Sequence, residues 1–330
     1  MDSTSAGVAL KGATPLEMDA RPDRMGEDFH LKTHMASDLQ PQSFVMRLCP
    51  PFLRPYVLLA RLDRPVPILL LMLPGLWGLL ASMRDARPAL HLWVIFALGA
   101  FLMRSAGCVI NDLTDARLDA RVARTSARPL AKGDLTRMQA LWFLAILLTA
   151  ALGLLFMLPP VCWAVGVLGA ALVTLYPWAK RVTGLPQIVL ALTYSWGVVM
   201  ASFATLGALT KVHAFLYGVA VIWVFIFDTL YAHQDKEDDA VLGLGSSALT
   251  LGASTKPILL SLIIPMGGLA FWAGVETGRT TLYFAAVLVG CASLAKTIRT
   301  ADLDAPEACK RAFQTSQVFG WMLLVGLMFD

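Results

Sequence analysis

Charged side chains are scarce in this chain: Asp, Glu, Lys and Arg together make up 15% of its 330 residues, whereas 57% of the residues are hydrophobic. Soluble domains carry roughly 25% charged residues and about 45–50% apolar ones. A water-soluble globule of this length has no way to bury so much apolar surface, and that class of protein is excluded. The composition therefore indicates an integral membrane protein.

Metal-binding and disulfide patterns are also missing. The five cysteines include no CxxC pair, and the five histidines are dispersed along the chain. These spacings exclude the usual zinc and haem motifs and a disulfide framework. The net charge is only +4, and the chain has no basic helix with interleaved aromatic residues. Nucleic-acid binding is therefore not expected.

Residues 1–45 are polar and show no apolar periodicity. A secretory signal begins with basic residues followed by an apolar run, and this segment has no such order. We expect a disordered polar N-terminal extension here, which leaves residues 46–330 as the membrane domain.

Long apolar runs begin at Val66 and have the length that crosses a bilayer, roughly 17 to 25 residues. Barrel strands are shorter and alternate in polarity, so these runs predict helices. The fold class that we expect is all-α, an integral membrane bundle of nine transmembrane helices. The predicted segments are 66–83, 90–110, 138–157, 160–178, 188–207, 213–231, 257–275, 280–297 and 313–329.

Basic residues are distributed unevenly between the two ends of these segments. With the N-terminus in the cytoplasm, the loops after the second, fourth, sixth and eighth segments hold most of the Lys and Arg residues. The opposite loops hold only Arg84, Arg87, Lys211 and Arg279. The positive-inside rule therefore predicts a cytoplasmic N-terminus and a basic cytoplasmic side.

Two acidic clusters lie at the cytoplasmic ends of the second and sixth segments. The first contains Asn111, Asp112, Asp115 and Asp119, and the second runs from Asp228 through Asp235 to Asp239. Residues three or four apart share a helix face, so the carboxylates of each cluster repel one another unless a cation lies between them. Oxygen ligands of this kind suit Mg²⁺, which binds one or two carboxylates together with phosphate oxygens.

Either cluster alone is equally compatible with solvated charges that cap a helix. Two such clusters beside membrane helices, each with basic neighbours, favour a cation-bridged polyphosphate. The basic neighbours are Arg124 and Arg128 after the first cluster and Lys180 and Arg181 in the loop after the fourth segment. Guanidinium and ammonium groups are the usual diphosphate ligands, although each of these residues also suits a simple topology signal.

Several stretches of the chain together resemble the UbiA superfamily of membrane prenyltransferases. They include Arg61-Leu-Asp-Arg-Pro, Arg104-Ser-Ala-Gly-Cys, the pattern NDxxDxxxD from Asn111 to Asp119, Tyr176-Pro-Trp-Ala-Lys-Arg and a DxxxD pattern from Asp235 to Asp239. The resemblance spans residues from about 55 to 330. It implies a bundle around a central cavity open to lipid, with a cytoplasmic cap, in a bacterial inner membrane.

The resemblance also implies the chemistry. A polyprenyl diphosphate is the expected donor, Mg²⁺ the expected cofactor and 4-hydroxybenzoate the favoured acceptor. The resemblance and the two clusters together predict the following roles: catalytic Asp112, Asp115, Asp235 and Asp239; metal-binding Asn111, Asp112, Asp115, Asp119, Asp235 and Asp239; diphosphate-binding Arg124, Arg128, Lys180 and Arg181; acceptor-binding Arg61, Arg104 and Tyr231. The isoprenoid tail is expected along the first and ninth helices or in the lipid-facing opening.

Two alternatives remain at this point. One is a prenyltransferase of the same family that acts on another acceptor, such as homogentisate, a naphthoate or haem. The other is a transporter or ion channel, which would place ionisable residues near the bilayer midplane rather than at helix ends.

Overall fold

The computed structural model describes residues 39, 43–64, 66–82, 89–120 and 125–330. Almost all of the predicted N-terminal extension lies outside these residues, as do Arg84, Arg87 and Arg124. The described residues form helices joined by short turns, without strands. The all-helical prediction is confirmed.

Each of the nine predicted segments coincides with helical structure. Among the described residues, eight helical spans are long and apolar enough to cross a membrane, and a ninth apolar helix is shorter. In chain order the long elements are α4 (Val66–Ala81), α5 (Leu90–Asp119), α7 (Arg137–Phe156), α8 (Val161–Val182), α9 (Pro186–Tyr194) with α10 (Trp196–Leu206), α11 (Lys211–Ala232), α14 (Thr255–Glu276), α15 (Thr281–Thr300) and α16 (Pro306–Thr315) with α17 (Gln317–Phe329).

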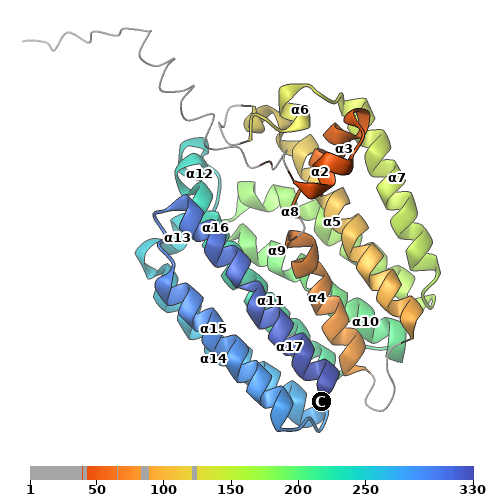
Figure 1. Cartoon of the computed structure of the whole chain (residues 1–330), viewed down its shortest axis with the longest axis vertical. Coiled ribbons are helices and arrows are strands. Elements are labelled where there is room, and N and C mark those ends of the chain that lie inside the picture. The colour runs from red at the N-terminus through yellow and green to blue at the C-terminus, as the bar shows by residue number, and fades with distance from the viewer. Residues whose placement is uncertain (1–38, 40–42, 65, 83–88, 121–124) are drawn as a thin grey trace, which may run out of the picture.

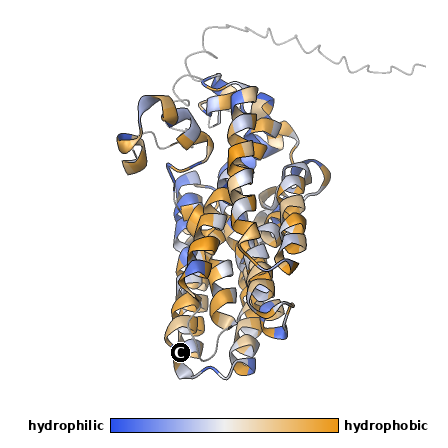
Figure 2. Cartoon of the chain, turned by 90° about the vertical axis from the view of Figure 1, so that its right-hand side faces the viewer, coloured by the Kyte–Doolittle hydropathy of each residue, from blue (hydrophilic) through white to orange (hydrophobic). Residues whose placement is uncertain are grey.

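The short elements gather at one end of the bundle, as Figure 1 shows. They are α2 (Phe44–Leu48), η1 (Pro51–Leu53), α3 (Arg54–Leu59), α6 (Pro129–Lys132), η2 (His233–Asp235), α12 (Lys236–Leu242), α13 (Ser247–Leu251) and η3 (Gly252–Ser254). Together they make the cap that the sequence predicted. Figure 2 shows hydrophobic residues along most of the length of the long helices below it.

Helix α5 extends well beyond the predicted end at residue 110. Its 30 residues span about 45 Å at 1.5 Å per residue, whereas the hydrocarbon core of a bilayer is about 30 Å thick. The apolar run therefore ends inside the helix, and the helix continues out of the hydrocarbon. The first acidic cluster lies on this polar extension, at the level of the cap.

The core of the bundle is an aromatic cluster between α4, α11 and α17. The rings of Trp77 and Trp223 lie 5.2 Å apart, and Phe319 packs edge-on to Trp77 at 6.3 Å. Both indole N–H groups are satisfied: Trp77 donates to the Gly320 carbonyl at 3.1 Å and Trp223 to the Ser316 carbonyl at 3.0 Å. These bonds hold α17 against α4 and α11.

Helices α4 and α10 approach each other through glycine. A Cβ atom on Gly197 would lie 3.0 Å from the Gly75 Cα, and a Cβ atom on Gly78 would lie 2.6 Å from the Ala201 Cβ. In membranes, where lipid tails are as apolar as side chains, small residues of this kind allow helices to pack closely.

We expect Gly78→Ala to destabilise the protein by about 1–3 kcal/mol, because the added methyl group overlaps the Ala201 Cβ and lies 3.2 Å from the backbone of Val198. Thermal unfolding in detergent measures the effect. Gly268→Ala on α14 is the matched control, since a Cβ atom there meets nothing within 4 Å. Equal melting temperatures for the two variants would contradict this account.

Candidate active site

A cavity of about 640 Å³ runs through the bundle and has a polar end and an apolar end. Carboxylates and amides from both acidic clusters line the polar end: Asn111 and Asp112 on α5, Asp228 on α11, Asp235 in η2 and Asp239 on α12. The two clusters, more than 100 residues apart in sequence, therefore share one cavity.

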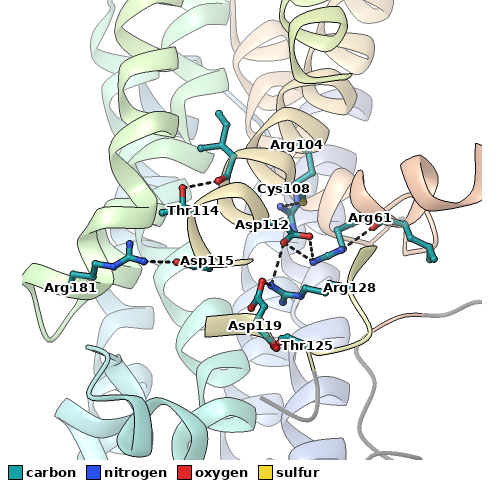
Figure 3. A network of polar contacts seen from close by, with 12 residues as sticks. Arg61, Arg104, Cys108, Asp112, Thr114, Asp115, Asp119, Thr125, Arg128 and Arg181 are labelled. Atoms are coloured by element: carbon teal, nitrogen blue, oxygen red, sulfur yellow. Dashed lines mark hydrogen bonds and ion pairs between the residues drawn. The ribbon is translucent and has the colours of Figure 1, made fainter. Parts of the chain in front are cut away.

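Arginine side chains neutralise the first cluster (Figure 3). Arg61 donates two hydrogen bonds to the Asp112 carboxylate at 2.9 and 3.0 Å. Arg128 bridges two carboxylates, at 2.9 Å from Asp119 and 3.3 Å from Asp112. Arg181 lies 2.7 Å from Asp115. Charge-assisted contacts of this kind offset the repulsion along the helix face.

The six predicted metal ligands do not all face the cavity. The cavity is lined by Asn111, Asp112, Asp235 and Asp239. Asp115 and Asp119 do not line it; they form ion pairs with Arg181 and Arg128, respectively. Among the described residues, no group of three or more His, Cys, Asp or Glu side chains lies close enough to hold a metal ion by itself. The lining donors are all hard oxygens, which fits an Mg²⁺ site completed by phosphate oxygens.

The second cluster is not a continuous α-helix. Helix α11 ends at Ala232, η2 tightens the chain over His233–Asp235, and α12 begins at Lys236. The buried His233 ring, which lies 3.1 Å from the Thr255 hydroxyl, anchors this change of geometry. Gln234, which lines the cavity, has a buried side-chain oxygen with no hydrogen-bond partner.

Asp228 is a further residue of the site: the sequence placed it in the second acidic cluster, but it was not among the predicted catalytic, metal-binding or substrate-binding residues. It lies on α11 one to two helical turns before the cap and lines the cavity beside the carboxylates of the cap. Its position could have been recognised from the sequence, because an acidic residue within an apolar membrane span usually has a functional role. Tyr176, Tyr194 and Gln187 also line the cavity. Tyr176 begins one of the stretches that carry the family resemblance, but none of the three was predicted to have a role in the site.

The predicted diphosphate-binding residues that the structure describes fall into two environments. Arg128 and Lys180 line the cavity. Arg181 does not; it pairs with Asp115, and its guanidinium carbon lies 5.6 Å from the centroid of the Trp178 ring. Arg124 lies outside the described residues.

Arg104 differs from the other arginines because it lies deep in the apolar part of α5. It donates to the Cys108 sulfur at 2.7 Å, and its guanidinium carbon lies 5.9 Å from the centroid of the Tyr194 ring. The Nε group is buried and has no hydrogen-bond partner. Arg61 and Tyr231 line the cavity as well; Tyr231 also packs against Phe313, with ring centroids 4.9 Å apart.

The apolar end of the cavity lies further from the cap. Phe96 and Met103 on α5, Val173 on α8 and Met200 on α10 contribute to its wall. The site thus joins a charged compartment at the end of the helices to an apolar compartment inside the bundle. That combination suits a molecule with an anionic head and a hydrocarbon tail.

Comparison with known proteins identifies relatives of high similarity. A bovine (Bos taurus) protein named mitochondrial 4-hydroxybenzoate polyprenyltransferase is 39% identical over 286 residues, which cover 86% of this chain and 77% of the relative. A 4-hydroxybenzoate octaprenyltransferase from Azotobacter vinelandii is 38% identical over 83% of this chain and 93% of the relative.

The fold also matches a solved structure. A UbiA homolog from Archaeoglobus fulgidus bound to GPP and Mg²⁺ superposes with a TM-score of 0.61 at 16% identity, and the match covers 83% of this chain and 99% of that one. A model of the UbiA prenyltransferase family matches residues 71–323. Since that model and relatives that are 38–39% identical both cover most of the sequence, the chain belongs to the UbiA prenyltransferase family.

Proposed function

We propose that this protein transfers a polyprenyl group from polyprenyl diphosphate to the ring carbon ortho to the hydroxyl of 4-hydroxybenzoate, a step of ubiquinone biosynthesis. The observation that carries the proposal is the single cavity with carboxylates and cations at its polar end and an apolar compartment below. The names of the relatives, which are 4-hydroxybenzoate polyprenyltransferases and octaprenyltransferases, support the donor and the acceptor.

The polar end would hold the donor's diphosphate. Asn111, Asp112, Asp235 and Asp239 would bind Mg²⁺, which neutralises the charge of the departing diphosphate. Support comes from the oxygen donors in the cavity and from the Mg²⁺ bound to the A. fulgidus homolog. Arg128 and Lys180 would contact the phosphate oxygens directly, while Asp115 and Asp119 orient Arg181 and Arg128.

The acceptor carboxylate would bind Arg104 rather than Arg61. Both arginines face the cavity, but Arg61 already donates two hydrogen bonds to Asp112. Arg104 keeps donors for a further partner, and a buried guanidinium requires an anion or other acceptors. It precedes Asn111 by seven residues, or about 10 Å along the helix, which leaves room for an aromatic ring between the carboxylate and the diphosphate.

Two further roles complete the reaction. The allylic cation formed when the C–O bond breaks reacts with the ring carbon, and the ring then loses a proton. Asp228 is the cavity carboxylate that we assign as the acceptor of this proton. The apolar walls exclude water, which would otherwise quench the cation.

The cap is proposed to face the cytoplasm of a bacterium, with the enzyme in the inner membrane. The concentration of Lys and Arg on the cap side supports this orientation. The similarity to the A. vinelandii relative supports the bacterial location, whereas other relatives are named mitochondrial.

Purified enzyme with Mg²⁺, geranyl diphosphate and 4-hydroxybenzoate should form a prenylated product, measured by mass spectrometry. Asp235→Asn and removal of Mg²⁺ by a chelator should each lower the rate by about 10²-fold or more, since charge stabilisation at the leaving group contributes several kcal/mol. Asp238→Asn is the matched control, because Asp238 is exposed and does not line the cavity.

Full activity of Asp235→Asn would remove the metal role assigned to this carboxylate. Homogentisate and a hydroxynaphthoate in the same assay test the acceptor. A faster reaction with either of them would overturn 4-hydroxybenzoate as the substrate.

Arg104→Gln should raise the KM for 4-hydroxybenzoate by roughly 10- to 100-fold, because hydrogen bonds to a charged group contribute about 1.5–3 kcal/mol. The KM for geranyl diphosphate should stay the same. The neutral analogue 4-hydroxybenzamide should bind the variant and the parent equally, which distinguishes a carboxylate contact from a general defect.

Arg117→Gln serves as the control, since Arg117 is exposed on the same helix. An unchanged KM for the acid in Arg104→Gln would exclude the contact.

A further inference from the structure

Gln187 is a buried polar residue of the cavity to which the reaction as described assigns no role. It lies in the first turn of α9, is only 6% exposed and lines the cavity. Burying an amide is costly unless its groups find hydrogen-bond partners. The partners of Gln187 therefore indicate what this side chain does.

A backbone group fixes the orientation of the Gln187 amide. The side-chain oxygen Oε1 accepts a hydrogen bond from the Ser247 N–H group at 2.9 Å. Because an N–H group bonds only to the oxygen of an amide, this contact distinguishes the two ends of the side chain. Among the described residues, the Nε2 end has no hydrogen-bond partner. Gln187 thus keeps an oriented N–H donor for a molecule in the cavity.

The connection between α12 and α13 holds Gln187 and Lys180 in place together. The Gly245 N–H group donates to the Lys180 carbonyl at 2.8 Å, and Ser247, two residues further on, holds the Gln187 amide. Gly245 lies so close to the Thr183 carbonyl that a Cβ atom would have no room. The end of α8 and the start of α9 are therefore fixed on one connection, and their two donors are preorganised.

Gln187 lies at the level of the cap, where the diphosphate is expected. Ser247 begins the cap element α13, and its hydroxyl donates to the Thr229 hydroxyl near the end of α11 at 3.0 Å. Tyr194, the residue of α9 whose ring lies 5.9 Å from the Arg104 guanidinium, follows Gln187 by seven residues. Seven residues are two helical turns, or about 10 Å. The compartment of the acceptor carboxylate is therefore deeper in the bundle than Gln187.

We propose that the Gln187 Nε2–H group donates a hydrogen bond to an oxygen of the donor's diphosphate. The inference rests on the proposed function, which supplies that diphosphate. When the allylic C–O bond breaks, its electron pair stays on the diphosphate oxygen, and a fixed donor in a cavity sheltered from water stabilises the charge that develops there. As a neutral group, Gln187 adds this stabilisation without the repulsion that a further cation would bring to Lys180 and Arg128.

Two substitutions separate this donor from the bond to Ser247. Gln187→Glu keeps an oxygen that accepts from Ser247 but loses the Nε2 donor, whereas Gln187→Met loses both. We expect both variants to lower kcat/KM for geranyl diphosphate at least about tenfold, or about 1.4 kcal/mol, and to leave the KM for 4-hydroxybenzoate unchanged. Pyrophosphate with Mg²⁺, measured by calorimetry without an acceptor, should also bind about tenfold more weakly.

Thr250→Val is the matched control. The Thr250 hydroxyl donates to the Gly184 carbonyl at 2.6 Å, so it also ties the turn between α8 and α9 to α13, but Thr250 does not line the cavity. This variant should leave the kinetics with both substrates and the affinity for pyrophosphate unchanged. Melting temperatures of all variants in detergent check the fold.

Parental kinetics in Gln187→Glu would show that only the bond to Ser247 matters and would overturn the proposal. A loss in Gln187→Glu without one in Gln187→Met would overturn it too, because the added charge would then be the cause. The same holds for an equal loss in Thr250→Val, or for a changed KM for 4-hydroxybenzoate in place of geranyl diphosphate.

The proposed function fails separately. It is overturned if the unsubstituted enzyme forms no product from geranyl diphosphate and 4-hydroxybenzoate. The calorimetric comparison of pyrophosphate binding still decides the role of Gln187 in that case, since it needs no turnover.

Discussion

The pairing of aspartate with arginine at the end of α5 is the constraint on which the site depends. Charges removed from bulk water are costly unless a partner compensates them, and three carboxylates on one helix add mutual repulsion. Arg61, Arg128 and Arg181 supply the compensation from three different parts of the chain. These contacts fix α3, α6 and α8 around the end of α5. The cap is thus assembled by the same charges that the chemistry requires.

Much of the fold was predictable because a bilayer imposes one simple requirement. Each membrane crossing needs a long apolar helix, so the nine segments could be recognised in the sequence as runs of apolar residues. The details within the helices were not visible in this way. The predicted fifth segment divides at Ser195 into α9 and α10, and the second segment continues as helix from its predicted end at residue 110 to Asp119.

The candidate site was predictable in its residue types but not in its contacts. Periodicity places Asp112 and Asp119 about 20° apart around α5 and Asp115 about 60° from Asp112. The first two share Arg128, whereas Asp115 meets Arg181 on α8. Which side of the helix faces the cavity depends on neighbours far away in sequence; Arg61 is 51 residues from Asp112. The choice between Arg61 and Arg104 rests on such long-range pairs, which a single sequence does not contain.

The excess length of α5 has an energetic consequence for the substrate. Because the helix carries its carboxylates past the hydrocarbon, an anionic headgroup can remain at the phase boundary while its lipid portion never leaves the oil-like layer. Neither half is transferred into the wrong dielectric medium. An enzyme that handles so amphiphilic a molecule thereby avoids the solvation penalty that extraction into water, or burial of the charge at the membrane midplane, would impose.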